Sequence, residues 1–176
     1  MKMTIACIAC ACATLLTACG GNTDNAAPTG PTGSADMGPA WLLTEQPADE
    51  QGVNIAKAFA QEGDSVVIRA RIGGRVEPMA PGSPAFTVVD LSLPYCGQLT
   101  DENCPTPWDY CCETPETITA NAATVQLVDD DGQPVSDDPT KSLSPLDELI
   151  IVGTVGPRPN PDVFLIRATG VYRVEG

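Results

Sequence analysis

Histidine is absent from all 176 residues of this sequence. Imidazole is the commonest general base in enzymes and the commonest nitrogen ligand of zinc, so its absence excludes the usual catalytic triads and histidine-based zinc sites. The remaining residues offer no nucleophile that can be paired with a base. We therefore predict no catalytic residues, and we expect a protein that is not an enzyme.

Basic residues are also scarce. Nine Lys and Arg stand against 23 Asp and Glu, which gives a formal net charge of −14, and aromatic residues make up only 5% of the chain. An acidic surface repels phosphate backbones, and single-stranded nucleic acids bind through aromatic stacking, which this chain can hardly supply. We expect no nucleic-acid partner and a solvated acidic surface.

Long apolar segments are missing, apart from one near the N-terminus. Lys2 precedes an apolar run at residues 5–16, a pattern typical of a secretory leader and too short for a membrane span of roughly 20 residues. The following LTACG, residues 16–20, resembles the lipobox of bacterial lipoproteins. That resemblance implies cleavage before Cys19, acylation of Cys19 and a membrane partner through the lipid anchor. Because Gly20 stands where an Asp would retain the protein at the inner membrane, the outer membrane of the cell envelope is favoured.

Composition divides the chain into four parts. Residues 20–40 are rich in Gly, Pro, Thr, Ser and Ala and lack apolar periodicity, which predicts a flexible tether. Apolar positions after Pro47 suit one face of a short helix that Gly63 ends. The predicted parts are a signal peptide (1–18), a tether (19–40), a helical segment (41–62) and a β domain (63–176) with a cysteine-rich insertion (94–122).

The β domain contains five segments with the apolar content or alternation of strands. These segments are residues 65–74, 85–93, 124–128, 148–156 and 163–174. Their order and spacing resemble the OB-fold, so we predict an all-β, five-stranded closed barrel with a short N-terminal helix and a long cysteine-rich loop between the second and third strands. Gly73 and Gly74 fall where the first strand of such barrels bends. Phe86 is the one aromatic residue of the second and third strands, and its apolar neighbours indicate a core position.

A narrower resemblance rests on four segments. GDSVVIRARIGG, FTVVDLSL, CPTPWDYCCE and ATGVYRV together are similar to a group of exported bacterial proteins with no assigned activity. The resemblance implies export and the barrel fold, and it implies no reaction.

Four cysteines remain after the leader and Cys19 are set aside: Cys96, Cys104, Cys111 and Cys112, spaced C-x7-C-x6-C-C. An exported domain folds in an oxidising compartment, and a long Pro-containing loop is costly to order without cross-links. We therefore predict two disulfides, each joining Cys96 or Cys104 to one member of the vicinal pair. This would make the loop the interaction surface of a non-enzymatic binding module with an extracytoplasmic protein partner.

Metal binding is the alternative. Four thiolates bind zinc tetrahedrally, and three would suit zinc or copper with Asp109 or Glu113 as an oxygen ligand, which would make the protein a metal-binding or metal-delivery protein. The spacing lacks paired CxxC knuckles, which weakens this reading. Thiol redox chemistry is disfavoured because the nearby carboxylates would raise a thiol pKa.

Two other features of the chain have structural readings. Trp108 and Tyr110 are expected to cap the barrel mouth with their apolar area. The acidic run at residues 129–131 lacks the pattern of a calcium loop, and with Gly132 it predicts a hairpin turn.

Overall fold

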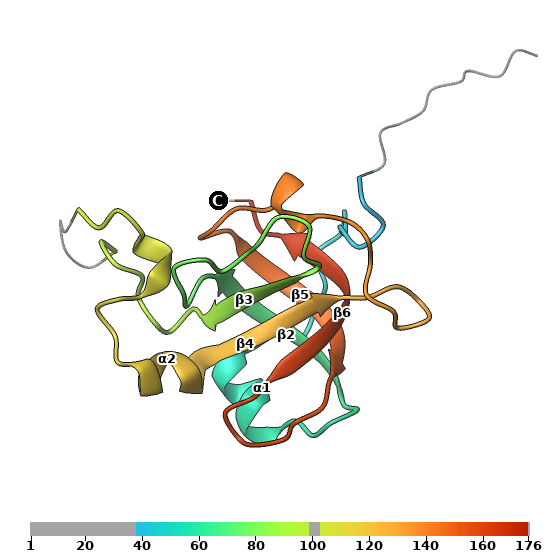
Figure 1. The fold of residues 1–176 in the computed structure, drawn as a ribbon. Helices are drawn as coiled ribbons and strands as arrows, with labels where there is room; N and C mark the ends of the chain where they lie inside the picture. Colours follow the sequence, from blue (N-terminus) through green and yellow to red (C-terminus); the bar gives the residue numbers. More distant parts are fainter. Residues whose placement is uncertain (1–37, 99–102, 176) are drawn as a thin grey trace, which may run out of the picture. The chain divides into compact units, whose positions relative to one another are not determined.

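Five strands form a closed barrel in the computed structural model, which describes residues 38–98 and 103–175 (Figure 1). Neighbouring strands pair in the order β2-β3-β4-β6-β5, and a β2–β5 pairing closes the ring. The β4–β6 pair is parallel and the others are antiparallel. This is the predicted OB-like topology. The strands are β2 (Ser65–Ile72), β3 (Ala85–Asp90), β4 (Ala122–Leu127), β5 (Glu148–Val155) and β6 (Leu165–Arg173).

The first barrel strand, β2, belongs to both halves of the barrel. It pairs with β5 along residues 65–71 and with β3 along residues 70–72. Val66, Ile68, Ala70 and Ile72 are buried, whereas Arg69 and Arg71 point to the other face. The period of two in the sequence therefore assigned the faces of this strand correctly.

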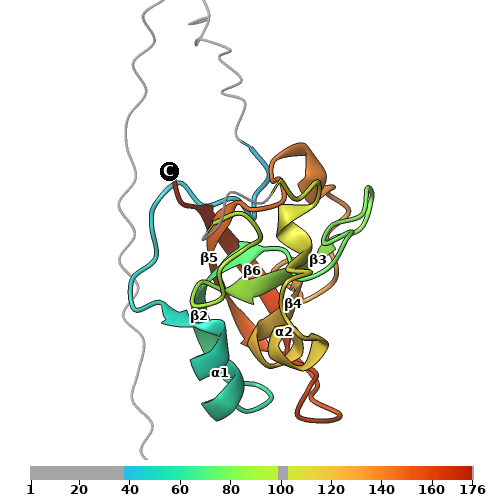
Figure 2. The same ribbon diagram turned by 90° about the vertical axis from the view of Figure 1, so that its left-hand side faces the viewer.

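One end of the barrel is covered by the predicted N-terminal helix, α1 (Val53–Phe59), which lies at the foot of the barrel in Figures 1 and 2. A two-residue strand, β1 (Gln51–Gly52), leads into α1 and pairs in parallel with β2. Val53 and Ala56 of α1 are buried in the main core. The buried carboxylate of Asp90 accepts a hydrogen bond from Asn54 N at 3.1 Å, which satisfies one of the free amide groups at the start of the helix.

The insertion between β3 and β4 has more regular structure than its sequence indicated. It contains a 3₁₀ helix, η1 (Pro107–Asp109), and a helix, α2 (Pro115–Asn121). Thr114 caps α2 by accepting a hydrogen bond from Thr117 N, and Pro115 occupies the first turn, where its missing N–H costs nothing. Helix α2 runs directly into β4.

Strand boundaries differ from the sequence-based predictions by one to three residues. Strand β3 ends at Asp90 rather than at residue 93, and β4 starts two residues early at Ala122. The connection after β4 contains a 3₁₀ helix, η2 (Pro139–Lys141). Asp138 fixes η2 because its side chain accepts a hydrogen bond from Thr140 N. No helix of the described residues is both long enough and apolar enough to cross a membrane. The predicted leader, Cys19 and nearly all of the predicted tether lie outside the described residues.

Candidate metal centre

The cysteine loop is anchored on the outer face of β3 through Tyr110. Val88 faces the main core, whereas its neighbour Val89 belongs to a second small apolar cluster with Leu93 and Tyr110. Tyr110 has no exposed surface and adopts a left-handed backbone conformation, with φ of 56°. The prediction that Tyr110 caps the barrel mouth is therefore corrected, because its ring packs on the opposite side of β3 from the barrel core.

Two glycines hold the loop against the barrel. The prediction that β2 bends at Gly73 and Gly74 is not borne out, since β2 ends at Ile72. A side chain at residue 73 would place a Cβ 2.6 Å from Trp108 O and 2.8 Å from the Tyr110 ring. Gly74 N donates a hydrogen bond to the same Trp108 O at 2.8 Å. These glycines permit the close approach of the loop backbone.

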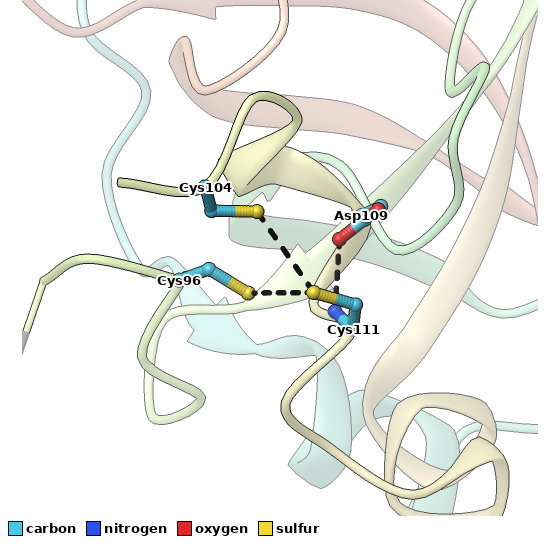
Figure 3. Close-up of side chains that lie close together, drawn as sticks. All are labelled: Cys96, Cys104, Asp109 and Cys111. Atoms are coloured by element: carbon cyan, nitrogen blue, oxygen red, sulfur yellow. Dashed lines mark hydrogen bonds between the residues drawn. The ribbon is translucent and has the colours of Figure 1, made fainter. Parts of the chain in front are cut away.

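Three of the four loop cysteines converge (Figure 3). The sulfur of Cys111 lies 3.5 Å from that of Cys96 and 3.9 Å from that of Cys104. One oxygen of Asp109 completes a group in which all four potential ligand atoms lie within 4.8 Å of one another. Zinc–sulfur bonds of about 2.3 Å in a tetrahedron place neighbouring sulfurs about 3.8 Å apart. The two measured sulfur separations match this spacing.

Asp109 shapes the turn that presents Cys111. Its Oδ1 accepts a hydrogen bond from Cys111 N at 2.8 Å, and its Oδ2 accepts one from the Thr106 hydroxyl at 2.8 Å. Burial alone would raise the pKa of the Asp109 carboxyl, but these hydrogen bonds and one from the Cys111 thiol outweigh it and lower the pKa. The carboxylate is therefore ionised at neutral pH, which a metal ligand requires.

Cys96 is the buried member of the group, and its N–H donates to Pro107 O at 3.2 Å. Burial would raise the pKa of its thiol, but hydrogen bonds from the backbone and thiol of Cys112, from Cys111 and from Cys104 outweigh burial and lower the pKa. The pKa of Cys111 is raised, first of all by its hydrogen bond to Cys96. The Cys96 thiol therefore loses its proton more readily than the Cys111 thiol.

Neither predicted disulfide is present. None of the four cysteines is in a disulfide, and the measured sulfur separations exceed an S–S bond of about 2.05 Å. The physical reason is that Cys96 and Cys104 both approach Cys111, so the sulfurs gather around one point instead of forming two separate pairs. Cys112 contacts Cys96 from the rim and is exposed. Glu113, the other oxygen ligand considered, is outside the converging group.

The positively charged side chain of Arg71, which the sequence did not indicate as part of the site, lies beside this loop. The Arg71 guanidinium carbon is 5.1 Å from the centre of the Tyr95 ring, and Tyr95 directly precedes Cys96. The period of two along β2 placed Arg71 on the outer face of the barrel. Nothing in the local sequence indicated that the loop would cover that face.

Three further predictions concern residues outside the cysteine group. Phe86 is 2% exposed and belongs to the main core, as predicted. The acidic run forms the predicted turn, since Asp129 Oδ1 accepts hydrogen bonds from Asp131 N and Gln133 N, and Gly132 has a φ of 73°. Trp108 is half-buried and donates from Nε1 to Val76 O at 2.9 Å, which ties the loop to the β2–β3 connection.

The fold and the site define a closed OB-like β-barrel that carries a thiol-rich loop on its outer face. No protein-family model matches the sequence, and no curated protein matches it. Among solved structures, the chain is similar to the hypothetical protein YgiW from E. coli, with 13% sequence identity and a TM-score of 0.38 over 78% of this chain and 99% of that one.

Proposed function

We propose that this protein is a lipid-anchored, non-enzymatic binding module of the cell envelope whose cysteine loop binds a thiophilic metal ion, zinc or copper. The observation that carries the proposal is the convergence of Cys96, Cys104, Cys111 and Asp109 within 4.8 Å. Three thiolates and a carboxylate are a ligand set that suits zinc, and thiolates also select monovalent copper.

The position of the loop supports metal binding over a purely structural role. Cys111 is exposed, Cys104 is half-exposed and Cys96 is buried, so the group is open on one side. Structural zinc sites are closed, whereas an open side allows an incoming ligand to reach the ion. The site therefore suits exchange of the ion with an extracytoplasmic protein partner that also offers thiolates.

The envelope location rests on the leader pattern and on Cys19. Two or more acyl chains on that residue would hold the domain at the membrane, and the Gly- and Pro-rich residues that follow would give it reach. The charge of −14 disfavours a nucleic-acid partner. The absence of histidine and of any paired nucleophile and base supports a role without catalysis.

The first experiment measures metal binding by the mature protein in detergent micelles under a thiol reductant. Competition with a chromophoric chelator gives the affinity for zinc and for monovalent copper, and cobalt substitution reports the geometry through its visible absorption. We expect one ion per chain and tetrahedral cobalt with sulfur-to-metal charge transfer. Cys111→Ser removes the central sulfur and should weaken zinc binding at least 100-fold. Cys112→Ser is the matched control, because it changes the adjacent thiol at the rim and should weaken binding less.

The intact mass of the protein tests the alternative to metal binding, which is a pair of disulfides. A mature protein isolated from cells without reductant and lacking four hydrogens relative to its reduced form would carry two disulfides, and the metal proposal would then be overturned. The anchor is tested separately with Cys19→Ala, which should block lipid attachment and leave the uncleaved leader visible by mass. Unchanged lipid attachment in this variant would contradict the assignment of Cys19.

A further inference from the structure

Two buried polar atoms behind the cysteine loop have no hydrogen bond of good geometry, although the two side chains lie within hydrogen-bonding reach of each other. They are Arg71 Nη1 and the Tyr110 hydroxyl, and Trp41 Nε1 is the third such side-chain atom in the described part of the chain. A buried polar atom without such a bond is destabilising, so its presence beside a candidate site calls for an explanation in terms of that site. Trp41 belongs to the main core and is remote from this argument.

The two tyrosines that surround Arg71 are each followed by a cysteine. Tyr95 lies under the guanidinium at 5.1 Å and precedes Cys96, and Tyr110 precedes Cys111. The Tyr110 hydroxyl lies within hydrogen-bonding reach of Arg71 and close enough to Cys96 for their charges to interact. The two cysteines concerned form the shorter of the two sulfur contacts, at 3.5 Å. Arg71 therefore lies against the two residues that directly precede Cys96 and Cys111.

The charge of Arg71 is only partly neutralised by its own ion pair. Its Nη2 lies 3.5 Å from Glu148, whereas Arg69 approaches the same carboxylate at 2.5 Å and also contacts Glu50 at 3.3 Å. The Arg71 side chain is 13% exposed, so water screens its charge less than that of Arg69, whose side chain is 36% exposed. The guanidinium is thus half-buried, and its positive charge is only partly neutralised by a carboxylate that it shares with Arg69.

A thiolate site needs such a cation. Three thiolates and one carboxylate around a divalent ion leave two negative charges, in a chain whose net charge is already −14. A half-buried guanidinium beside the loop offsets part of this negative charge, because opposite charges attract more strongly where water is partly excluded.

Resting on the proposed function, we propose that Arg71 is a positioning residue that compensates the negative charge of the thiolate site and thereby strengthens binding of a divalent thiophilic ion such as zinc. The guanidinium contacts the tyrosines and is not itself a ligand. It would therefore change metal affinity through its charge and through the placement of Tyr95 and Tyr110. Residues that support metal ligands in this way typically change metal affinity by about 10- to 100-fold.

The test compares zinc affinities of the mature protein and four variants at one pH and ionic strength. Arg71→Gln should bind zinc about 10- to 100-fold more weakly, and Arg71→Lys, which keeps the charge, should restore most of the loss. Arg69→Gln is the matched control, because it changes an arginine of the same strand that contacts Glu50 and Glu148. It should alter affinity less than about threefold. Cobalt spectra of each variant report whether the ligand set is unchanged.

Glu148→Gln is included because it is expected to increase zinc affinity, which distinguishes the role of Arg71 from a loss caused by misfolding. Removing the carboxylate that shares Arg71 should tighten zinc binding several-fold, and a gain of affinity cannot arise from a damaged fold. Wild-type affinity in Arg71→Gln, or no rescue by lysine, would overturn the role of Arg71 while leaving the metal site intact. Absence of zinc binding by the wild-type protein would instead overturn the proposed function on which this role rests.

Discussion

Lys57 connects three segments that are distant in sequence, and its removal should destabilise the fold measurably. Its ammonium group donates hydrogen bonds to Thr119 O at 2.5 Å, Asp162 O at 2.8 Å and Ala122 O at 3.3 Å. The side chain belongs to α1, and the acceptors lie at the end of α2, at the start of β4 and in the β5–β6 connection. Only 8% of the residue is exposed, so water cannot replace these contacts easily.

Lys57→Met keeps the length and apolar stem of the side chain and removes the three donors. The two shorter contacts alone represent roughly 3 to 6 kcal/mol, taking about 1.5 to 3 kcal/mol for each hydrogen bond to a charged group. Burying the ammonium offsets part of this stabilisation, so we expect a net loss of about 2 to 3 kcal/mol. Urea unfolding followed by circular dichroism measures the free energy of unfolding. Lys141→Met, at an exposed lysine, is the control and should change it by less than about 0.5 kcal/mol.

The pH dependence of the free energy of unfolding tests how burial of the Lys57 charge contributes to stability. Burial lowers the pKa of Lys57 below its usual 10.5, Asp162 opposes this shift, and Arg158 adds to it. Between the lowered pKa and 10.5 the unfolded chain binds more protons than the folded one, so the stability of the wild-type protein rises with pH in that window. Lys57→Met lacks this rise, and the stability difference should therefore widen as the pH increases toward 10.5. A difference that narrows, or a loss below 0.5 kcal/mol at neutral pH, would refute the reasoning about Lys57.

Two substitutions probe how the cysteine loop is anchored. Gly73→Ala should lower the free energy of unfolding by about 2 kcal/mol or more, because the new Cβ meets the backbone oxygen of Trp108 and the Tyr110 ring. It should also weaken zinc binding. A urea unfolding curve measures the first effect, and a chelator titration measures the second. Tyr110→Phe should change the free energy of unfolding by less than about 1 kcal/mol, because the buried hydroxyl lies against Arg71 without a hydrogen bond of good geometry. A loss of more than about 1 kcal/mol in that variant would show that the hydroxyl is bonded.

The barrel was predictable because its evidence is local and repeated. Alternating residues in β2 mark an inner and an outer face, and the apolar segments of β5 and β6 mark strands buried in the ring. Five such segments in this order leave few ways to bury their apolar faces. The short helix after Pro47 was likewise visible as a stripe of apolar positions, and α1 occupies part of that segment.

The cysteine loop was predictable in content but not in geometry. Its four cysteines and Asp109 were recognised as candidate ligands, yet their spacing favoured two disulfides. Sequence separation along an irregular loop says little about which sulfurs meet, since that depends on η1, on the left-handed residue Tyr110 and on the turn formed by Asp109. These features bring three sulfurs to one point.

The residue pattern alone was enough to identify the barrel strands, the acidic character, the lack of imidazole chemistry and the candidate ligands. Each of these depends on composition or on a short repeating pattern. The folded chain was needed to show that Gly73 and Gly74 admit the loop backbone, that Lys57 connects three segments and that Arg71 stacks on Tyr95 of the cysteine loop. Those contacts join residues far apart in the chain, and they exist only after closure of the barrel has fixed the surface on which the loop packs.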